Sequence, residues 1–188
     1  MEPEERLPYQ ATLAAQSYQD MRLPVRVLLD NVRSAYNVGA FFRTADATAV
    51  DHLYLCGITG RPPNREITKT ALGADDTVGW SYVPDATGAV HVMRGQGYQV
   101  AAIETNVHAI DLFEWTPQFP VCVLFGNEVS GVQPEVAALV DVHIRIPMLG
   151  LKHSLNVATA GGVVLYELLR KYQQLRQQAA PDNPYNML

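Results

Sequence analysis

The sequence predicts a single α/β domain with a mainly parallel sheet and helices on both faces. Short apolar runs of strand length alternate with helical patterns along the 188 residues, and this alternation is typical of βαβ units. A chain of 188 residues also fits one domain with a sizeable hydrophobic core. We expect the domain over 1–188, with a polar N-terminal arm over 1–23 and a frayed C-terminal tail over 179–188.

The first half of the chain predicts a βαβ unit. Residues 25–29 (VRVLL) and 52–56 (HLYLC) have the composition of strands. Between them we expect a helix that Asn37 caps and that ends near Thr48. The connection is expected to be right-handed. The further elements predicted in the middle of the chain are a strand over 80–83, a helix over 85–96 and a strand over 98–103.

Two strand-like runs in the second half each end in a glycine-containing loop. Residues 121–125 (VCVLF) are continuously apolar and predict a strand buried on both faces, which ends at Gly126. Residues 142–146 predict an adjacent strand followed by Gly150. Ligands of open α/β sheets bind outside the carboxyl ends of the strands, so these two loops are expected to form the floor of a binding site. The helices predicted in this half run over 134–139 and from about Ser154 to Gln178.

The composition is that of an ordinary globular protein, with 48% hydrophobic and 18% charged residues. A net charge of −5 argues against non-specific coating of nucleic acid but leaves room for a local basic patch. No apolar run is long enough to cross a bilayer and the chain starts with acidic residues, so we expect a cytoplasmic protein. Cys56 and Cys122 lie in apolar runs and are expected to be buried free thiols. We expect no metal site, because no Cys/His cluster has ligand spacing.

Several common site motifs are absent from the sequence. No G-x-G-x-x-G follows the first strand, and there is no P-loop motif and no G-x-S-x-G nucleophile elbow. A nicotinamide-dependent oxidoreductase is therefore disfavoured.

Three stretches resemble, in order and in spacing, motifs 1, 2 and 3 of the SpoU (TrmH) branch of the SPOUT RNA methyltransferases. They are residues 31–45 (NVRSAYNVGAFFRTA), residues 124–131 (LFGNEVSG), and IPM at 146–148 together with SLNV at 154–157. Residues 69–74 (KTALGA) are similar to the linking segment common in that branch. The resemblance covers roughly residues 25–170, and it is specific because all three motifs match together.

This resemblance implies a deep C-terminal trefoil knot, a rare exception to unknotted chains. It also implies a homodimer with its sites at the subunit interface, and S-adenosylmethionine bound in the knotted loops, with S-adenosylhomocysteine as product. The cofactor contacts that it implies are Glu104, Thr105, Gly126, Ile146, Met148, Leu155 and Asn156. Gly126 and Gly150 are expected to allow close approach of the backbone. Gly161 and Gly162 are expected to allow tight helix packing, which we place at the dimer interface.

The reaction implied is methyl transfer to a ribose 2′-hydroxyl of RNA. The catalytic residues that the resemblance implies are Arg43, foremost, and Asn37, Glu128, Ser154 and Asn156. An arginine keeps its proton at neutral pH, so we expect Arg43 to bind a phosphate and to stabilise negative charge on the hydroxyl oxygen. Taken singly, Arg43 and Glu128 also fit solvated surface residues, and Asn37 and Ser154 fit helix caps.

Basic residues in the predicted loops are candidates for RNA contact. They are Arg33, Arg61, Arg65, Lys69 and Lys152. A compact transfer RNA stem-loop is expected in preference to ribosomal RNA. Two alternatives remain: a non-catalytic RNA- or cofactor-binding module with the same fold, and a base methyltransferase of the wider superfamily.

Overall fold

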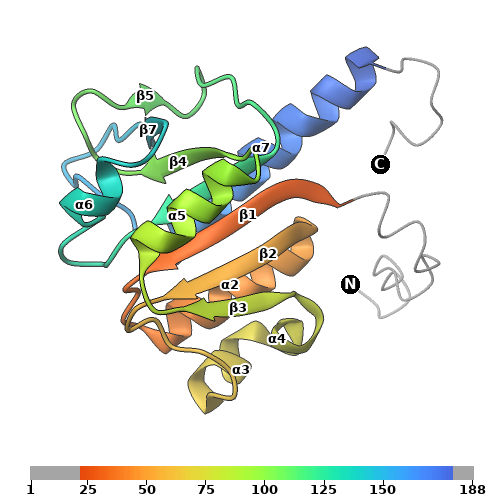
Figure 1. Ribbon diagram of the computed structural model, residues 1–188, viewed down its shortest axis with the longest axis vertical. Coiled ribbons are helices and arrows are strands. Elements are labelled where there is room, and N and C mark those ends of the chain that lie inside the picture. The colour runs from red at the N-terminus through yellow and green to blue at the C-terminus, as the bar shows by residue number, and fades with distance from the viewer. Residues whose placement is uncertain (1–21, 180–188) are drawn as a thin grey trace.

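The computed structural model describes residues 22–179, which form a seven-stranded sheet with helices on both faces (Figure 1). The strand order is β3-β2-β1-β6-β4-β7-β5, and every neighbouring pair is parallel. The strands are β1 (Leu23–Asp30), β2 (Val50–Cys56), β3 (Trp80–Val83), β4 (Gln99–Ile103), β5 (Ile110–Asp111), β6 (Val121–Phe125) and β7 (Val142–Arg145). The helices are α2 (Ala35–Ala47), α3 (Arg65–Ala71), α4 (Ala74–Thr77), α5 (Ala86–Gly95), α6 (Pro134–Ala137) and α7 (Val157–Ala179). The predicted α/β class is confirmed.

The two faces of the sheet bury separate hydrophobic clusters. In β1, Val25, Val27 and Leu29 pack in the cluster that α2 and α7 cover, whereas Leu28 packs in the cluster under α5 and α6. This alternation follows from the period of two in a strand. Every residue of β6 is buried, as its continuous apolar run predicts.

The order of the strands corrects one prediction. β6 and β7 are not adjacent, because β4 lies between them: Ala101 of β4 is paired with Val123 on one side and with Val142 on the other. An apolar run identifies a strand but carries no information about its neighbours in a parallel sheet. Three loops therefore meet at this edge: those after β6 and β7, expected from the strand runs, and the one after β4, whose Glu104 and Thr105 the resemblance implied.

Two helix starts differ from the predictions. The side chain of Ser34, not of Asn37, caps α2, and it accepts a hydrogen bond from the N–H of Asn37. Helix α7 begins at Val157 and not at Ser154, and the Oδ1 atom of Asn156 accepts from the N–H groups of the next turn. Each helix has two candidate caps close together in the sequence, and only the residue just before the first turn reaches the free N–H groups.

Other boundaries fall near the predictions. Asp85 caps α5, whose start was predicted at that residue. Helices α3 and α4 and strand β5 were not predicted, because each is too short to show a period. The predicted arm and tail lie outside the described residues except at their edges, where Leu23 begins β1 and Ala179 ends α7.

Gly161 lies where α7 crosses α2 within the same chain. A Cβ atom built on Gly161 would lie 2.3 Å from the Cε1 atom of Phe41, so only glycine permits this contact. The prediction that Gly161 serves a dimer interface is therefore replaced by packing within the chain. A Cβ on Gly162 would have no neighbour within 4 Å in the described chain.

Both cysteines are buried and free, as predicted. Burial raises the pKa of Cys56 and of Cys122 to about 12, so both thiols stay protonated. Within residues 22–179, no cluster of three or more His, Cys, Asp or Glu side chains is arranged to hold a metal ion. In the same residues, no helix has both the length and the apolar character to span a bilayer.

Candidate functional site

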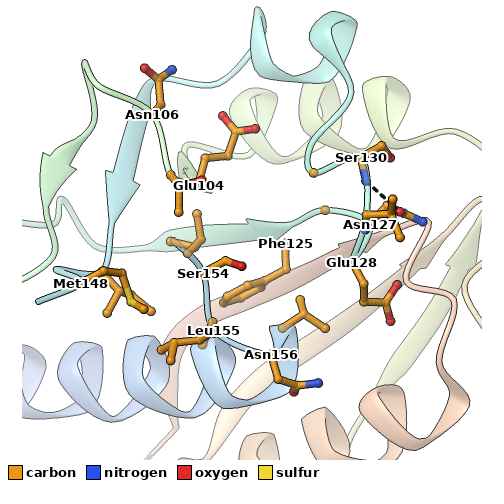
Figure 2. A pocket seen from close by; sticks show the side chains of 18 of the residues that line it. Glu104, Asn106, Phe125, Asn127, Glu128, Ser130, Met148, Ser154, Leu155 and Asn156 are labelled. Carbon is orange, nitrogen blue, oxygen red and sulfur yellow. Dashed lines mark hydrogen bonds between the residues drawn. The ribbon is translucent and has the colours of Figure 1, made fainter. Parts of the chain in front are cut away.

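A cavity of about 710 Å³ opens at the carboxyl ends of β4, β6 and β7 (Figure 2). Residues 103–107, residues 125–131 and a set of residues between 146 and 160 line it. The ring of Phe125, drawn among the lining residues in Figure 2, is buried beneath the cavity, and its centre is 5.0 Å from that of Phe41 in α2. The volume is in the range of sites for small organic ligands.

The loop that follows β6 is a tight turn that only glycine permits at its first position. A Cβ on Gly126 would lie 2.3 Å from the carbonyl carbon of Gly131 and 2.4 Å from the N atom of Val132. Asn127 and Gly131 exchange two backbone hydrogen bonds, and the Oδ1 atom of Asn127 accepts from the N–H groups of the residues between them. The backbone of this wall of the cavity is therefore held in one conformation.

The carboxylate of Glu128 lies at the N-terminus of α2. One of its oxygens accepts a hydrogen bond from the N–H of Arg33 at 2.9 Å, and the other accepts from the N–H of Ser34 at 3.1 Å and the Nδ2 atom of Asn37 at 2.9 Å. Free N–H groups and the helix dipole favour an anion at this place. Glu128 therefore joins the loop after β6 to α2.

These bonds decide the charge of Glu128. Partial burial by itself would raise the pKa of Glu128, but the hydrogen bonds from Arg33, Asn37 and Ser34 outweigh it and lower the pKa below its usual value. The carboxylate is ionised at neutral pH, and its oxygens are already engaged. Glu128 is therefore better suited to position its neighbours than to accept a proton.

Asn37 extends this network across the site to α7. Its Oδ1 atom accepts from the Nδ2 atom of Asn156 at 3.1 Å. The chain Asn156–Asn37–Glu128 thus ties together segments that hold all three resembling motifs. In Figure 2, Asn156 and Glu128 lie on the same side of the cavity, away from Met148.

A second polar pair lies at the opposite wall. The Nδ1 atom of His143 in β7 is 3.2 Å from a carboxylate oxygen of Glu104, which follows β4. Both side chains are largely buried. Glu104 lines the cavity, so it presents negative charge to any ligand there.

The residues predicted to contact the cofactor all line the cavity. They are Glu104, Thr105, Gly126, Ile146, Met148, Leu155 and Asn156. Gly150 does not make the expected close approach, because a Cβ built on it would have no described neighbour within 4 Å. Sequence reasoning did not select Phe125 or His143. Phe125 is the last residue of β6, and this position is the signal that would have identified it, whereas His143 is the second residue of β7 and has no such signal.

The structure brings together four of the five predicted catalytic residues. Glu128, Ser154 and Asn156 line the cavity, and Asn37 is hydrogen-bonded to two of them. Arg43 does not line the cavity: it is an exposed residue of α2, roughly 9 Å further along the helix axis than Asn37. Within one chain, Arg43 therefore stays apart from this group.

The predicted RNA contacts are all exposed. Arg33 precedes α2, Arg61 follows β2, and Arg65 and Lys69 belong to α3, whereas Lys152 lies in the segment after β7 that also lines the cavity. The ends of β1 and β2 lie at the same edge of the sheet as the cavity, because the strands are parallel. These cations therefore share that edge.

The sheet is parallel, and the loops after β4, β6 and β7 form a ligand cavity at its edge. One chain of hydrogen bonds joins the three motifs there. Together these features define a class of cofactor-binding domains. The chain belongs to the SpoU rRNA Methylase family, whose model matches residues 24–166.

Relatives and solved structures agree with this membership. The tRNA (guanosine(18)-2′-O)-methyltransferase of Escherichia coli (strain K12) is 35% identical over 147 residues, which cover 78% of this chain and 63% of that protein. The chain therefore spans less than two thirds of that relative's length. The structure of the TrmH/SpoU tRNA modifying enzyme of A. aeolicus aligns with a TM-score of 0.75 and 27% sequence identity. The alignment covers 89% of this chain and 88% of that one. The structure of an AdoMet-bound rRNA methyltransferase from Sinorhizobium meliloti aligns with a TM-score of 0.74 and 30% sequence identity. The alignment covers 81% of this chain and 59% of that one.

Proposed function

We propose that this protein transfers a methyl group from S-adenosylmethionine to a ribose 2′-hydroxyl of RNA, with transfer RNA as the favoured substrate. The observation that carries the proposal is the cavity at the ends of β4, β6 and β7 with the Asn156–Asn37–Glu128 chain on one wall. The E. coli and A. aeolicus relatives are named for action on transfer RNA, which supports that substrate.

The lining of the cavity fits an adenosyl sulfonium ligand. Ile146 and Leu155 offer apolar surface for a purine ring, and the backbone at Gly126 can approach closely. Glu104 offers a carboxylate to the hydroxyl or ammonium groups of such a ligand. When bound, S-adenosylmethionine supplies an electrophilic methyl carbon next to a positive sulfur.

The residues of this chain orient the nucleophile. Asn156 lies at the wall of the cavity and is fixed by three hydrogen bonds, two at the start of α7 and one to Asn37. A fixed amide can hold a ribose hydroxyl in line with a reacting carbon, and such positioning is a major source of rate enhancement. The hydroxyl proton then leaves to solvent or to a neighbouring acceptor, because Glu128 is already engaged.

We place Arg43 in the site of a partner subunit. Exposed apolar side chains flank the cavity: Val129 is 82% exposed, Leu149 100% and Leu151 95%. A cluster of this kind favours burial against a second copy of the chain. In such a homodimer, Arg43 of the partner subunit would bind the phosphate beside the reacting hydroxyl and stabilise the charge that develops on the hydroxyl oxygen.

The remaining parts of the proposal concern topology and location. We propose that the segment after β7, residues 146–156, threads through the chain as a deep trefoil knot. One methyltransferase domain would occupy residues 1–188. The enzyme would work in the cytoplasm, where transfer RNA is modified.

The direct test is to incubate the protein with S-adenosylmethionine carrying a labelled methyl group and with bulk transfer RNA, and then to digest the RNA to nucleosides. Label in 2′-O-methylated nucleosides is the expected result, with an Asn156→Ala variant as the inactive control. Label on a base would instead identify a base methyltransferase. Cofactor binding without any label in RNA would identify a binding module.

A further inference from the structure

Two exposed tyrosines at the sheet edge that holds the cavity each lie beside a cation. The guanidinium carbon of Arg61 is 4.0 Å from the centre of the Tyr82 ring, and the Nζ atom of Lys69 is 5.9 Å from the centre of the Tyr36 ring. Tyr36 is 45% exposed and Tyr82 40% exposed, so both rings remain accessible in the chain. Tyrosine rings with cations above them are the elements that proteins use to bind unstacked bases.

The two pairs lie on the same face of the sheet. Trp80, two residues before Tyr82 in β3, packs in the cluster that α2 covers, so Tyr82 points to that side as well. A Cβ built on Gly60 would lie 3.8 Å from the Cβ atom of Ala35. Gly60 directly precedes Arg61 in the chain, and Ala35 directly precedes Tyr36. The backbone segments that carry Arg61 and Tyr36 therefore lie side by side.

The backbone beneath the pairs is fixed by hydrogen bonds. The Oγ1 atom of Thr59 accepts from the N–H of Val32 and donates to the carbonyl of Leu29. The Oγ1 atom of Thr70 in α3 donates to the carbonyl of Tyr36. Because these contacts hold the loop after β2 and helix α3 against the start of α2, little ordering is required when a ligand binds.

One of the two pairs lies on the helix that carries a residue of the site. Tyr36 directly precedes Asn37, which is hydrogen-bonded to Glu128 and Asn156 at the wall of the cavity. Because consecutive residues of a helix do not face each other, a nucleotide stacked on Tyr36 would lie on a flank of the site, outside the cavity. Arg33 and Arg65 add positive charge along the same edge, where Glu66 is the acidic neighbour on α3.

We propose that Tyr36–Lys69 and Tyr82–Arg61 form a stacking strip for unpaired nucleotides that flank the methylated nucleotide. The inference rests on the proposed function and makes it more specific: the RNA is single-stranded next to its target, with at least two unstacked bases. Tyr36 and the guanidinium of Arg61 present faces to the bases, and the two cations also contact phosphates. Because every base has a flat face, the strip selects unpaired structure and not sequence.

The test uses two fluorescent RNA oligomers of about ten nucleotides, one an oligoadenylate and one with the same backbone but no bases. Fluorescence anisotropy measures the affinity of each. The wild type is expected to bind the oligoadenylate about tenfold or more tightly than the abasic oligomer. Tyr36→Leu and Tyr82→Leu should each reduce this preference several-fold, whereas Tyr36→Phe and Tyr82→Phe, which keep the ring, should retain it.

The cations should behave differently from the rings. Arg61→Gln and Lys69→Gln should weaken binding of both oligomers and reduce the slope of log affinity against log salt by about 0.7 each. Arg22→Gln, an exposed arginine beside the opposite end of β1, is the matched control and should change neither oligomer's affinity. A thermal melt and calorimetric cofactor binding check that each variant is folded.

Equal affinity of the wild type for both oligomers, or an unchanged preference in the leucine variants, would overturn the strip. A duplex RNA that competes as well as the single strand would overturn it too. These binding measurements need no methyl transfer, so the absence of methylated nucleosides would refute the proposed function without deciding the strip. Conversely, full methylation with an unchanged KM for transfer RNA in Tyr36→Leu and Tyr82→Leu would refute the strip alone.

Discussion

The side-chain amide of Asn156 donates a hydrogen bond to the Oδ1 atom of Asn37 over 3.1 Å, and this contact joins the start of α7 to the first turn of α2. Because Asn37 in turn donates to Glu128, the orientation of both amides is determined. Asn37 needs one acceptor and one donor at the same time, and only an amide of this length offers both.

Replacement of Asn37 by aspartate should break this chain. The new carboxylate would lie next to that of Glu128, and two like charges at hydrogen-bond distance raise the pKa of one of them. We expect turnover to fall about a hundredfold at neutral pH and to recover partly in mild acid, where the pair holds a proton. A pH profile of methyl transfer measures this. Addition of Glu128→Gln, whose amide donates to the aspartate, should restore activity; a double variant no better than the single one would contradict the network.

Gly126→Ala should disrupt the cofactor wall. The added methyl group would lie 2.3–2.4 Å from backbone atoms of Gly131 and Val132, which cannot move without opening the turn. We expect a loss of about 1–3 kcal/mol in the free energy of unfolding and at least a tenfold weaker affinity for S-adenosylmethionine. Urea unfolding and calorimetry measure the two effects. Gly150→Ala, where a Cβ has no described neighbour within 4 Å, is the control; equal effects of both substitutions would disprove the steric argument.

Arg43→Ala should leave the cofactor affinity nearly intact and reduce turnover by orders of magnitude. If Arg43 serves the partner's site, a mixture of Arg43→Ala and Asn156→Ala subunits regains one complete site in each mixed dimer. Random exchange then restores about a quarter of the wild-type activity, although each variant alone is inactive. Methyl transfer after subunit exchange is the measurement. No recovery in a mixture shown to exchange would place Arg43 outside the partner's site, and wild-type turnover of Arg43→Ala would remove its assigned role.

Asp30 should make stability depend on pH in the weakly acidic range. It is 2% exposed, and burial raises its pKa above the ordinary value of 3.8. The folded state therefore holds the proton to a higher pH than the unfolded state. The stability from this group is present in full below about 3.8 and is lost as the pH rises through the raised pKa. Urea unfolding of wild type and Asp30→Asn over this range should show the wild type falling behind the variant as pH rises.

Asp85 provides a control of opposite sign. Hydrogen bonds from the side chain and backbone of Thr87 and from the N–H of Gly88 lower the pKa of Asp85. The wild type should therefore gain stability relative to Asp85→Asn as the pH rises from the lowered pKa to about 3.8, and should show no further change above it, since asparagine keeps the helix cap but not the charge. The same slope in both pairs would refute the assignment of Asp30.

Lys171 should contribute to stability by holding the segment before β6 to α7. Its ammonium group donates to the carbonyls of Leu112, at 2.7 Å, and of Trp115, and its side chain is 11% exposed. Lys171→Met keeps the stem but leaves these carbonyls without their donor, at a cost of about 1–3 kcal/mol in the free energy of unfolding. Chemical denaturation measures this. Arg170→Met, which removes an exposed ion pair with Glu167, should change stability little, and a comparable loss in both would contradict the argument.

Local chemistry was sufficient to predict most elements, whereas the candidate site residues were implied by the resemblance of the three motifs. The buried run of β6 and the helix cap at Asp85 follow from side chains within a few positions of one another. The residues implied by the three motifs line the cavity or contact its wall, except Arg43. The knot and the homodimer stay predictions.

By itself, the sequence determined the α/β class and the apolar strands, because these depend on the period and chemistry of neighbouring residues. The candidate site residues came from the resemblance of three motifs to a known family. Only the tertiary structure decided that β4 separates β6 from β7, that Ser34 and Asn156 are the caps, and that Gly161 packs on Phe41. It also decided that Asn37 and Asn156, 119 positions apart, share a hydrogen bond. The physical reason is that strand order and contacts between distant segments arise from burial of the whole sheet, and no local pattern encodes them.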